Sequence, residues 1–462
     1  KNYNKTKRES IAERCKVFHM KGKMKYFALF CFHYMVESEV AEKQGPDLSK
    51  KEIVLAGEIR YTKATTQGAK KKTPRKGGEG DFMFSFDFED KIRFTKAVYY
   101  SFRPIPLPKP FKDGTGGMGK YAPEQGCLEL YDQTGACAHY SVGRSFVKDM
   151  LPRLLTGEEM SYNEWRHSLY WKIRNSGFQS GQAVDVGSVD LMMLDILAQR
   201  AGKPIHRFLG AEKDWAAAYK GGGSLLLSDE ELVEDMTRYV EEGFRTVKFK
   251  VGSGEGKDME RDIRRLEKVR KAVGEDIGIA VDANQRWDVE DAWKFAKLAS
   301  PYHLEWLEEP IHSHDMNGIK RLKEMGVDMP IAFGESMRIS YAYETYIEKG
   351  VDHLQPSLGR MSRIDDLIRI RDMAREKGVT FSSGGRAAVN AYFGCLYNEN
   401  ERIEYHEPIS RPVAEYMLNV PETKDGKFIC PADIPGLPAR MNIEKLEKDG
   451  YLESRVIYYP SK

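Results

Sequence analysis

Three acidic residues recur at nearly constant spacing in the second half of the chain, each at or just after the end of a short apolar segment. They are Asp282, Glu308 and Glu335, and the intervals between them are 26 and 27 residues. One strand, one helix and two loops occupy about this length, so the pattern predicts successive β/α units of a barrel. Each unit would deliver one carboxylate to the same rim, because the ends of parallel strands lie at one edge of a sheet.

Carboxylates that converge on one point repel one another unless a cation lies between them. The oxygen atoms of Asp282, Glu308 and Glu335 are hard ligands, and hard oxygen ligands suit Mg²⁺ and similar divalent cations. The sequence therefore predicts a metal site at the rim, and we expect Mg²⁺ as the cofactor.

A lysine pair lies one predicted unit before the first of these acids. In the segment 246–252, Lys248 and Lys250 are two residues apart, and residues two apart in a strand share a face. Two neighbouring ammonium groups lower each other's pKa, and a lysine that is neutral near pH 7 is a competent general base. The pair therefore indicates proton transfer beside the predicted metal.

Length and charge limit the other interpretations. At 462 residues the chain exceeds a usual single domain, so we expect one large barrel and a smaller partner domain. Its 72 basic and 70 acidic residues nearly cancel, which argues against nucleic-acid binding over a whole surface. No uninterrupted apolar run is long enough to cross a membrane. We therefore expect neither nucleic acid nor membrane as a partner.

Cysteine usage favours a reducing compartment. The six cysteines include no CxxC pair, so we expect neither a disulfide framework nor a zinc knuckle. A cytoplasmic location is our expectation. The apolar residues 27–32 after Met24 leave export open as an alternative, although no clean cleavage site follows them.

Four short motifs carry a resemblance to a known family. They are Lys248-Phe249-Lys250, Val281-Asp282-Ala283-Asn284, Trp306-Leu307-Glu308-Glu309-Pro310 and Gly334-Glu335-Ser336. In this order and spacing they resemble the enolase superfamily, specifically its mandelate racemase-like and muconate lactonizing enzyme-like branch. The resemblance extends over roughly residues 92–440.

The resemblance implies an α/β fold, a (β/α)7β TIM-type barrel with an α+β capping domain. We expect the capping domain over residues 91–212 and the barrel over residues 213–405. Residues 406–462 are expected to complete the capping domain. Residues 1–90, which include the basic run 70–76, are expected to be an atypical N-terminal extension.

The resemblance also assigns roles to individual residues. It implies that Asp282, Glu308 and Glu335 bind Mg²⁺, which in turn grips a substrate carboxylate. Lys250 matches the base that removes the proton alpha to that carboxylate, and Lys248 matches the lysine that contacts the carboxylate and tunes the base. Metal and lysine charges would offset the negative charge that develops on the enediolate.

Further positions are candidates for contact with the reacting groups. By resemblance, Glu404 matches an acid that hydrogen-bonds the enediolate, and Asn284 is a candidate contact to substrate or to metal-bound water. Arg386 follows two glycines and is a candidate for binding a second anionic group. His353 is a candidate substrate contact or replacement acid, and a structural histidine inside the barrel is the alternative interpretation.

Two positions depart from the family pattern. The racemase-like branch has an aspartate after the sixth barrel strand and a histidine after the seventh, whereas this chain has Ser357 and Gly384 there. Racemization needs an acid and a base on opposite faces, so we expect a one-base reaction in which Lys250 starts the dehydration of an acid sugar. A racemase or epimerase, a cycloisomerase, and a non-catalytic homologue that binds metal and anion are the alternatives.

A segment rich in proline and glycine, residues 102–121, is predicted to form a lid over the site. Its lysines, Lys109, Lys112 and Lys120, suit a small anionic hydroxy-carboxylate substrate, and they suit bare solvent equally well. We expect the chain to form a homo-oligomer.

Overall fold

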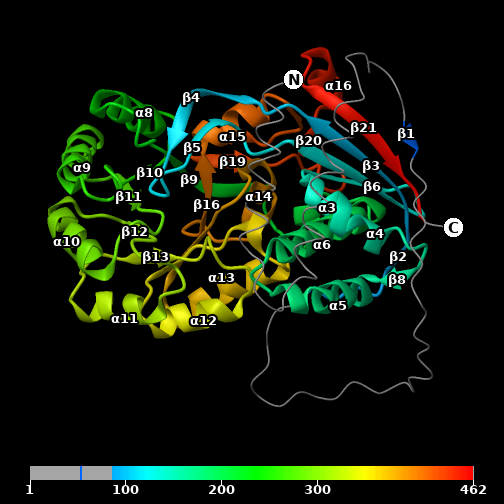
Figure 1. Cartoon of the computed structure of the whole chain (residues 1–462), viewed down its shortest axis with the longest axis horizontal. Coiled ribbons are helices and arrows are strands. Elements are labelled where there is room, and N and C mark those ends of the chain that lie inside the picture. Colours follow the sequence, from blue (N-terminus) through cyan, green and yellow to red (C-terminus); the bar gives the residue numbers. More distant parts are fainter. Residues whose placement is uncertain (1–52, 55–85, 461–462) are drawn as a thin grey trace, which may run out of the picture. The chain divides into compact units, whose positions relative to one another are not determined.

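The computed structural model of the chain describes residues 53–54 and 86–460 (Figure 1). Nearly all of the predicted N-terminal extension over residues 1–90, including the basic run 70–76 and the apolar segment after Met24, lies outside the described residues.

Eight parallel strands of the described chain close into a barrel, in which β16 pairs with β9 and β9 pairs with β10. The strands are β9 (Trp215–Gly222), β10 (Thr246–Lys250), β11 (Gly278–Asp282), β12 (Trp306–Glu308), β13 (Ile331–Phe333), β14 (His353–Leu354), β15 (Thr380–Ser383) and β16 (Arg402–His406). The predicted α/β TIM-type barrel is confirmed. Because the strands run in sequence order around the barrel, consecutive loops lie side by side at its mouth.

One helix crosses between each pair of consecutive barrel strands, and Figure 1 shows these helices outside the strands. They are α8 (Asp229–Glu241), α9 (Met259–Val273), α10 (Val289–Ala299), α11 (Met316–Glu324), α12 (Tyr341–Glu348), α13 (Asp365–Lys377) and α14 (Ala387–Gly394). Side chains satisfy the free backbone N–H groups where several of them begin: Ser228 and Glu231 form a capping box on α8, and Asp258 and Asp288 cap α9 and α10.

Strand register sets the height of the polar residues in the barrel. Lys250 pairs with Asp282, and Asp282 pairs with Glu308, across three neighbouring strands. Lys248 lies one layer lower, level with Gly221 of β9 and Ala280 of β11. The floor below is apolar and aromatic, a cluster of buried side chains from Tyr219, Ala280, Trp306 and Ala332. Polar groups are therefore concentrated at the carboxyl end of the barrel, above a closed core.

A second, mostly antiparallel region is built around a five-stranded sheet with the order β1-β21-β3-β6-β7, in which only β1 and β21 pair in parallel. Its strands are β1 (Ile53–Val54), β3 (Phe94–Phe102), β6 (Gly126–Asp132), β7 (Cys137–Tyr140) and β21 (Leu452–Tyr458). A short pair, β2 (Lys91–Ile92) with β8 (Met160–Ser161), accompanies it. The C-terminal strand β21 thus lies inside a sheet whose other members come from the first third of the chain.

Helices follow the first strands of this region. They are α3 (Arg144–Asp149), α4 (Leu151–Leu154), α5 (Tyr162–Lys172), the 3₁₀ turn η1 (Arg174–Ser176), α6 (Gly181–Arg200) and α7 (Ile205–Phe208). A buried ion-pair network links α5 and α6 to α13 of the barrel: Arg166 lies 2.6 Å from Asp365 and 3.2 Å from Asp190. The network fixes the helical layer against the barrel.

The predicted lid segment is a β-hairpin, β4 (Pro106–Lys112) with β5 (Met118–Tyr121). Its tip docks on the barrel loops, since the Leu225 N–H donates to the Lys112 carbonyl at 2.9 Å. Gly114 lies so close to the backbone after β11 that an added Cβ would stand 2.2 Å from the Ala283 carbonyl oxygen. Only glycine fits at this contact.

The chain after the barrel forms short elements. They are α15 (Glu407–Ala414), β17 (Met417–Leu418), β18 (Glu422–Lys424), β19 (Lys427–Ile429), β20 (Arg440–Met441) and α16 (Ile443–Lys448). Two 3₁₀ turns belong to earlier connections between barrel elements: η2 (Ser300–Tyr302) precedes β12, and η3 (Leu358–Arg360) follows β14. β19 pairs antiparallel with β9 and extends the barrel sheet outward. Among the described helices, none has the length and apolar character needed to span a membrane.

Candidate active site

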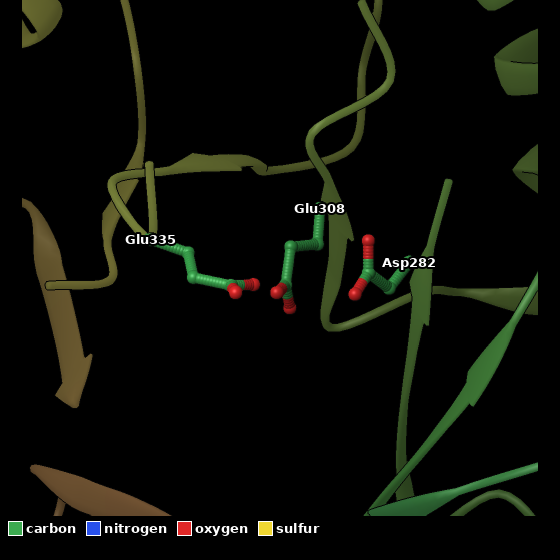
Figure 2. Close-up of side chains that lie close together, drawn as sticks. All are labelled: Asp282, Glu308 and Glu335. Carbon is green, nitrogen blue, oxygen red and sulfur yellow. The ribbon is translucent and has the colours of Figure 1, made fainter. Parts of the chain in front are cut away.

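Figure 2 shows the side chains of Asp282, Glu308 and Glu335 pointing toward one another. Asp282 and Glu308 are the last residues of β11 and β12, and Glu335 follows β13 after one glycine. One oxygen atom from each carboxylate lies within 4.8 Å of the other two. Asp282 and Glu308 are buried, whereas Glu335 is partly exposed. The structure thus brings the three predicted ligands together at the mouth.

This donor set fits a hard divalent cation. An octahedral Mg²⁺ with bonds of about 2.1 Å holds its ligand oxygens about 3 Å apart in cis and about 4.2 Å apart in trans. Small side-chain rotations would bring carboxylate oxygens that lie within 4.8 Å of one another to those separations. The Glu335 side chain is 32% exposed, so the site is open on one side to a further ligand.

Burial and repulsion shape the acidity of these groups. Burial and the neighbouring charge of Asp282 raise the pKa of Glu308 to about 8, against the opposing effect of Lys248. Burial also acts to raise the pKa of Asp282, but Lys250 and Lys248 outweigh it and hold that pKa below its ordinary value. The raised pKa of Glu308 indicates that the lysines do not fully neutralise the acids at the mouth.

Lys248 and Lys250 both point into the barrel and contact the carboxylates. The Lys250 Nζ lies 2.5 Å from Asp282 Oδ2, and the Lys248 Nζ lies 2.6 Å from Glu308 Oε2 and 2.8 Å from Glu404 Oε1. The two lysines do interact in the predicted direction, because Lys248 lowers the pKa of Lys250.

The net pKa of each lysine is nevertheless raised. Burial lowers the pKa of Lys250, but Asp282 raises it by more. Burial likewise lowers the pKa of Lys248, and Glu308 and Glu404 together outweigh that effect. The sequence argument included the repulsion between the lysines but not the carboxylates that contact them. These carboxylates turn the expected lowering of the lysine pKa into a rise.

Asn284 and Glu309 lie directly behind the acids. Asn284 has a left-handed backbone, with φ of 47°, and its backbone N–H donates to Asp282 Oδ1 at 2.8 Å while its side-chain amide donates to Oδ2 at 3.2 Å. Glu309 accepts from Gln285 Nε2 at 2.9 Å, and burial, Glu335 and Asp282 raise its pKa to about 7. Gln285 also binds Ser336 and was missed by the sequence analysis.

His353 is part of the barrel floor. Its two ring nitrogens lie 2.7 Å from the hydroxyls of Thr380 and Ser382, and its ring stacks on Trp306 at 4.6 Å. Burial, with Arg402 and Lys248, lowers the pKa of this histidine to about 3. Both nitrogens are used within the protein, an arrangement that is typical of a structural histidine; contact of His353 with substrate stays a prediction.

Arg386 lies at the start of α14 and reaches the antiparallel region. It donates to Glu124 Oε1 at 3.1 Å and to the Ser141 carbonyl at 3.2 Å, and its guanidinium lies over the Tyr140 ring. A third of the side chain is exposed. These contacts join the two regions of the structure, and sequence spacing alone gave no sign of them.

The positions of the missing acid/base pair lie next to each other. Ser357 and Gly384 form an isolated parallel bridge, in which the Gly384 N–H donates to the Pro356 carbonyl at 2.8 Å. A Cβ added at Gly384 would lie 3.3 Å from Glu404 Oε2 and 3.9 Å from the Ser357 Cβ. Both positions therefore border the same interior as Glu404, and neither supplies a titratable group.

Arg360 is a rim residue that contacts the third acid. It lies at the end of η3 and its guanidinium is 2.9 Å from Glu335 Oε1. The pair is partly exposed, so its net contribution to stability is small.

Comparison with known proteins supports the resemblance. A model described as enolase C-terminal domain-like matches residues 231–445, which span the barrel from α8 onward and continue into α16. Over these residues the chain is similar to the enolase superfamily. The resemblance to its mandelate racemase-like branch that the four motifs predicted is confirmed.

The relatives within the superfamily include both lyases and isomerases. L-talarate/galactarate dehydratase of Salmonella typhimurium is 28% identical over 321 residues, which are 69% of this chain and 75% of that protein. The 3,6-anhydro-alpha-L-galactonate cycloisomerase of Streptomyces coelicolor is 26% identical over 356 residues, which are 74% of this chain and 95% of that protein.

A solved structure agrees with this assignment. The Salmonella typhimurium L-talarate/galactarate dehydratase, liganded with Mg and L-lyxarohydroxamate, is 25% identical to this chain. The two share a TM-score of 0.65, with 81% of this chain and 96% of that chain covered.

Proposed function

We propose that this chain is a Mg²⁺-dependent enzyme that removes the proton alpha to a carboxylate and then eliminates water from an acid sugar. The observation that carries the proposal is the arrangement at the barrel mouth. A lysine, Lys250, contacts Asp282 of a three-carboxylate cluster at 2.5 Å, while the second acid/base positions hold Ser357 and Gly384.

Asp282, Glu308 and Glu335 would hold the metal, whose charge when bound stabilises the dianionic enediolate that proton removal creates. Lys250 would take the proton from Cα as a neutral amine, which requires a bound cation to offset the charge of Asp282 that raises the pKa of this lysine. Lys248 and Glu404 form a hydrogen-bonded pair at 2.8 Å beside it, and the Lys248 ammonium group can bind the substrate carboxylate while remaining paired. Fixed donors of this kind act without reorganising as charge develops.

Elimination of water needs only one base. Lys250 accepts the Cα proton, the electron pair of that bond forms the double bond between Cα and Cβ, and the C–O bond at Cβ breaks. The hydroxyl leaves with a proton as water, and the resulting enol becomes a 2-keto acid. A two-base proton exchange at Cα would need a second group on the far side, where Ser357 and Gly384 offer none.

The lid hairpin contributes less charge to substrate binding than its lysines suggest. Lys109 lies 2.8 Å from Glu231 and Lys112 lies 3.3 Å from Glu255, and both acids belong to barrel elements. These two lysines support closure of the lid, and Lys120, like Lys109, is exposed. We expect the substrate to be a small hydroxy-carboxylate that is recognised mainly by the barrel mouth.

A library of acid sugars incubated with protein and MgCl₂ tests the proposal. We expect formation of a 2-keto acid from at least one member, and a loss of about 10²–10⁴-fold in kcat when Lys250→Met removes the base. His303→Asn, an exposed histidine away from the mouth, is the control and should match the wild type.

Each other result has a distinct meaning. Full turnover by the Lys250→Met variant would exclude Lys250 as the base. Deuterium uptake at Cα from D₂O without net product would indicate an isomerase. Tight binding of acid sugars without either result would favour a homologue that binds metal and anion without catalysis.

A further inference from the structure

The inward face of β16 carries three polar residues at alternate positions, Arg402, Glu404 and His406. Arg402 is the lowest, with its guanidinium over the Trp306 ring of the barrel floor. Glu404 lies at the level of the lysines and binds Lys248. His406 is the last residue of the strand, so it stands at the carboxyl end, where the reacting groups lie. Tyr405 between them packs against Phe428 outside the barrel, as the alternation requires.

Among the described histidines, three have one buried ring nitrogen without a hydrogen-bond partner: His406 and His206 at Nδ1, and His139 at Nε2. His353 uses both ring nitrogens. His406 differs from His139 and His206 in its place, because it ends a barrel strand and lies among the charges of Glu404, Lys250 and Lys248. A buried imidazole nitrogen without a partner is costly unless something else binds it.

The surroundings of His406 are those of the site. In the strand register it lies level with Gly221 of β9, which in turn lies level with Lys248 of β10. Gly221 has no side chain, and a Cβ there would lie 3.2 Å from Glu404 Oε1 and 3.7 Å from Lys248 carbons. The side chains of Glu404 and Lys248 therefore fill the space that a larger residue at position 221 would need.

The lid closes directly on this ring. Phe111 of β4 packs edge-on against His406 with ring centres 4.8 Å apart. The edge-on aromatic contact restricts the orientation of the imidazole in the docked hairpin.

We propose that His406 donates the proton that the leaving hydroxyl needs, in the role for which Ser357 and Gly384 provide no side chain. The proposal rests on the dehydration proposed above. As the C–O bond at Cβ breaks, the imidazolium proton passes to the departing oxygen and water forms. The imidazole is left neutral, and the Cα proton is left on Lys250.

The charges around the ring keep it neutral at pH 7 in the protein without substrate. Burial and the ammonium groups of Lys250 and Lys248 lower the pKa of His406 to about 4, while Glu404 raises it. A substrate carboxylate bound at the same mouth, and the negative charge that grows on it after Cα deprotonation, act in the direction of Glu404. The proposed role therefore requires that the deprotonated substrate raise the pKa of His406 toward the working pH.

The test separates proton removal from loss of the leaving group. His406→Asn and His406→Gln are compared with wild type on the acid sugar that wild type dehydrates and on its β-fluoro analogue. Fluoride departs without a proton, so an acid is needed for the hydroxyl substrate alone. We expect a loss of about 10²–10⁴-fold in dehydration, with fluoride release and Cα deuterium exchange within about threefold of wild type. His303→Asn, an exposed histidine distant from the mouth, is the control.

Equal loss on both substrates, loss of deuterium exchange in both variants, or unchanged dehydration would each overturn the role of His406. These outcomes differ from failure of the proposed function. In that case the wild type itself would neither release water nor exchange the Cα proton with any acid sugar.

Discussion

Two sets of buried carboxylates in this protein differ in the groups that surround them. On α6, Asp190 pairs with Arg166 at 3.2 Å and accepts from the Ile364 N–H at 2.8 Å, and Asp195 accepts from the Leu437 N–H at 2.7 Å. Each of these acids faces donors. At the barrel mouth, Asp282, Glu308 and Glu335 face one another, with an oxygen of each within 4.8 Å of the others.

The difference separates structural from functional acids. An acid whose partners are hydrogen-bond donors stabilises the fold at its own position, and its removal leaves those donors unpaired. Acids that face acids repel one another; at the mouth Lys250, Lys248 and Arg360 offset part of this repulsion, and a bound divalent cation would offset more of it. Substitution in the two sets should therefore affect different properties of the protein.

The largest effect is expected from Glu308→Gln. Loss of one metal-binding oxygen should reduce kcat/KM by about 1,000-fold or more, since several kcal/mol of transition-state stabilisation depend on the metal. The free energy of unfolding without Mg²⁺ should change little, because the relief of repulsion from Asp282 offsets the loss of the Lys248 contact, and Lys248 keeps Glu404 as its partner. Calorimetric titration with MgCl₂ measures the loss of metal binding, and urea unfolding measures the free energy of unfolding. A variant that is unstable but still binds Mg²⁺ normally would contradict the comparison.

Asp190→Ala should lower stability and leave activity unchanged. Removing it breaks a buried ion pair and leaves the Ile364 N–H unsatisfied, so we expect a loss of about 3 kcal/mol in the free energy of unfolding. Below the unfolding transition, kcat and the Mg²⁺ affinity should equal those of the wild type. Asp190→Asn retains an acceptor and should lose less. Reduced Mg²⁺ affinity in the folded variant would show that α6 and the mouth are coupled.

The smallest expected effect concerns pH. Burial raises the pKa of Asp195 to about 7, whereas an unfolded chain has an Asp pKa of about 4. The folded protein binds this proton more tightly, so the stability that it contributes is complete below pH about 4 and is lost as the pH rises to about 7. Asp195→Asn has no such proton.

The Tm of Asp195→Asn relative to wild type should therefore move upward by a few degrees between pH 5 and pH 8, as measured by thermal unfolding at the two pH values. A constant difference between the two proteins would show that the Asp195 carboxyl does not titrate in this range.

Much of the fold and part of the site followed from the spacing of residues along the chain. The constant interval between Asp282, Glu308 and Glu335 predicted that they end successive strands, and parallel register then requires them to meet. The same alternation placed Lys248 and Lys250 on one face. These predictions need only the length of a β/α unit and the two-residue period of a strand.

The contacts that sequence could not supply lie between strands far apart in the chain. The Glu404 carboxylate that binds Lys248 comes from the eighth strand and the lysine from the second, so their pairing depends on barrel closure. The same closure brings His406 to the mouth. Strand alternation predicts that His353 points into the barrel. Its role as a floor residue depends on its depth in the barrel, which the pattern along the chain does not encode.

The bridge between Ser357 and Gly384 has a consequence for how reaction type evolves in this barrel. Gly384 needs no special backbone conformation, and the nearest atoms to an added Cβ are a carboxylate oxygen and a small side chain. The backbone therefore still holds two adjacent places from which an aspartate and a histidine would face the interior. A switch between lyase and isomerase on this scaffold would take exchange of two side chains, with the metal cluster and the loops around it left as inherited.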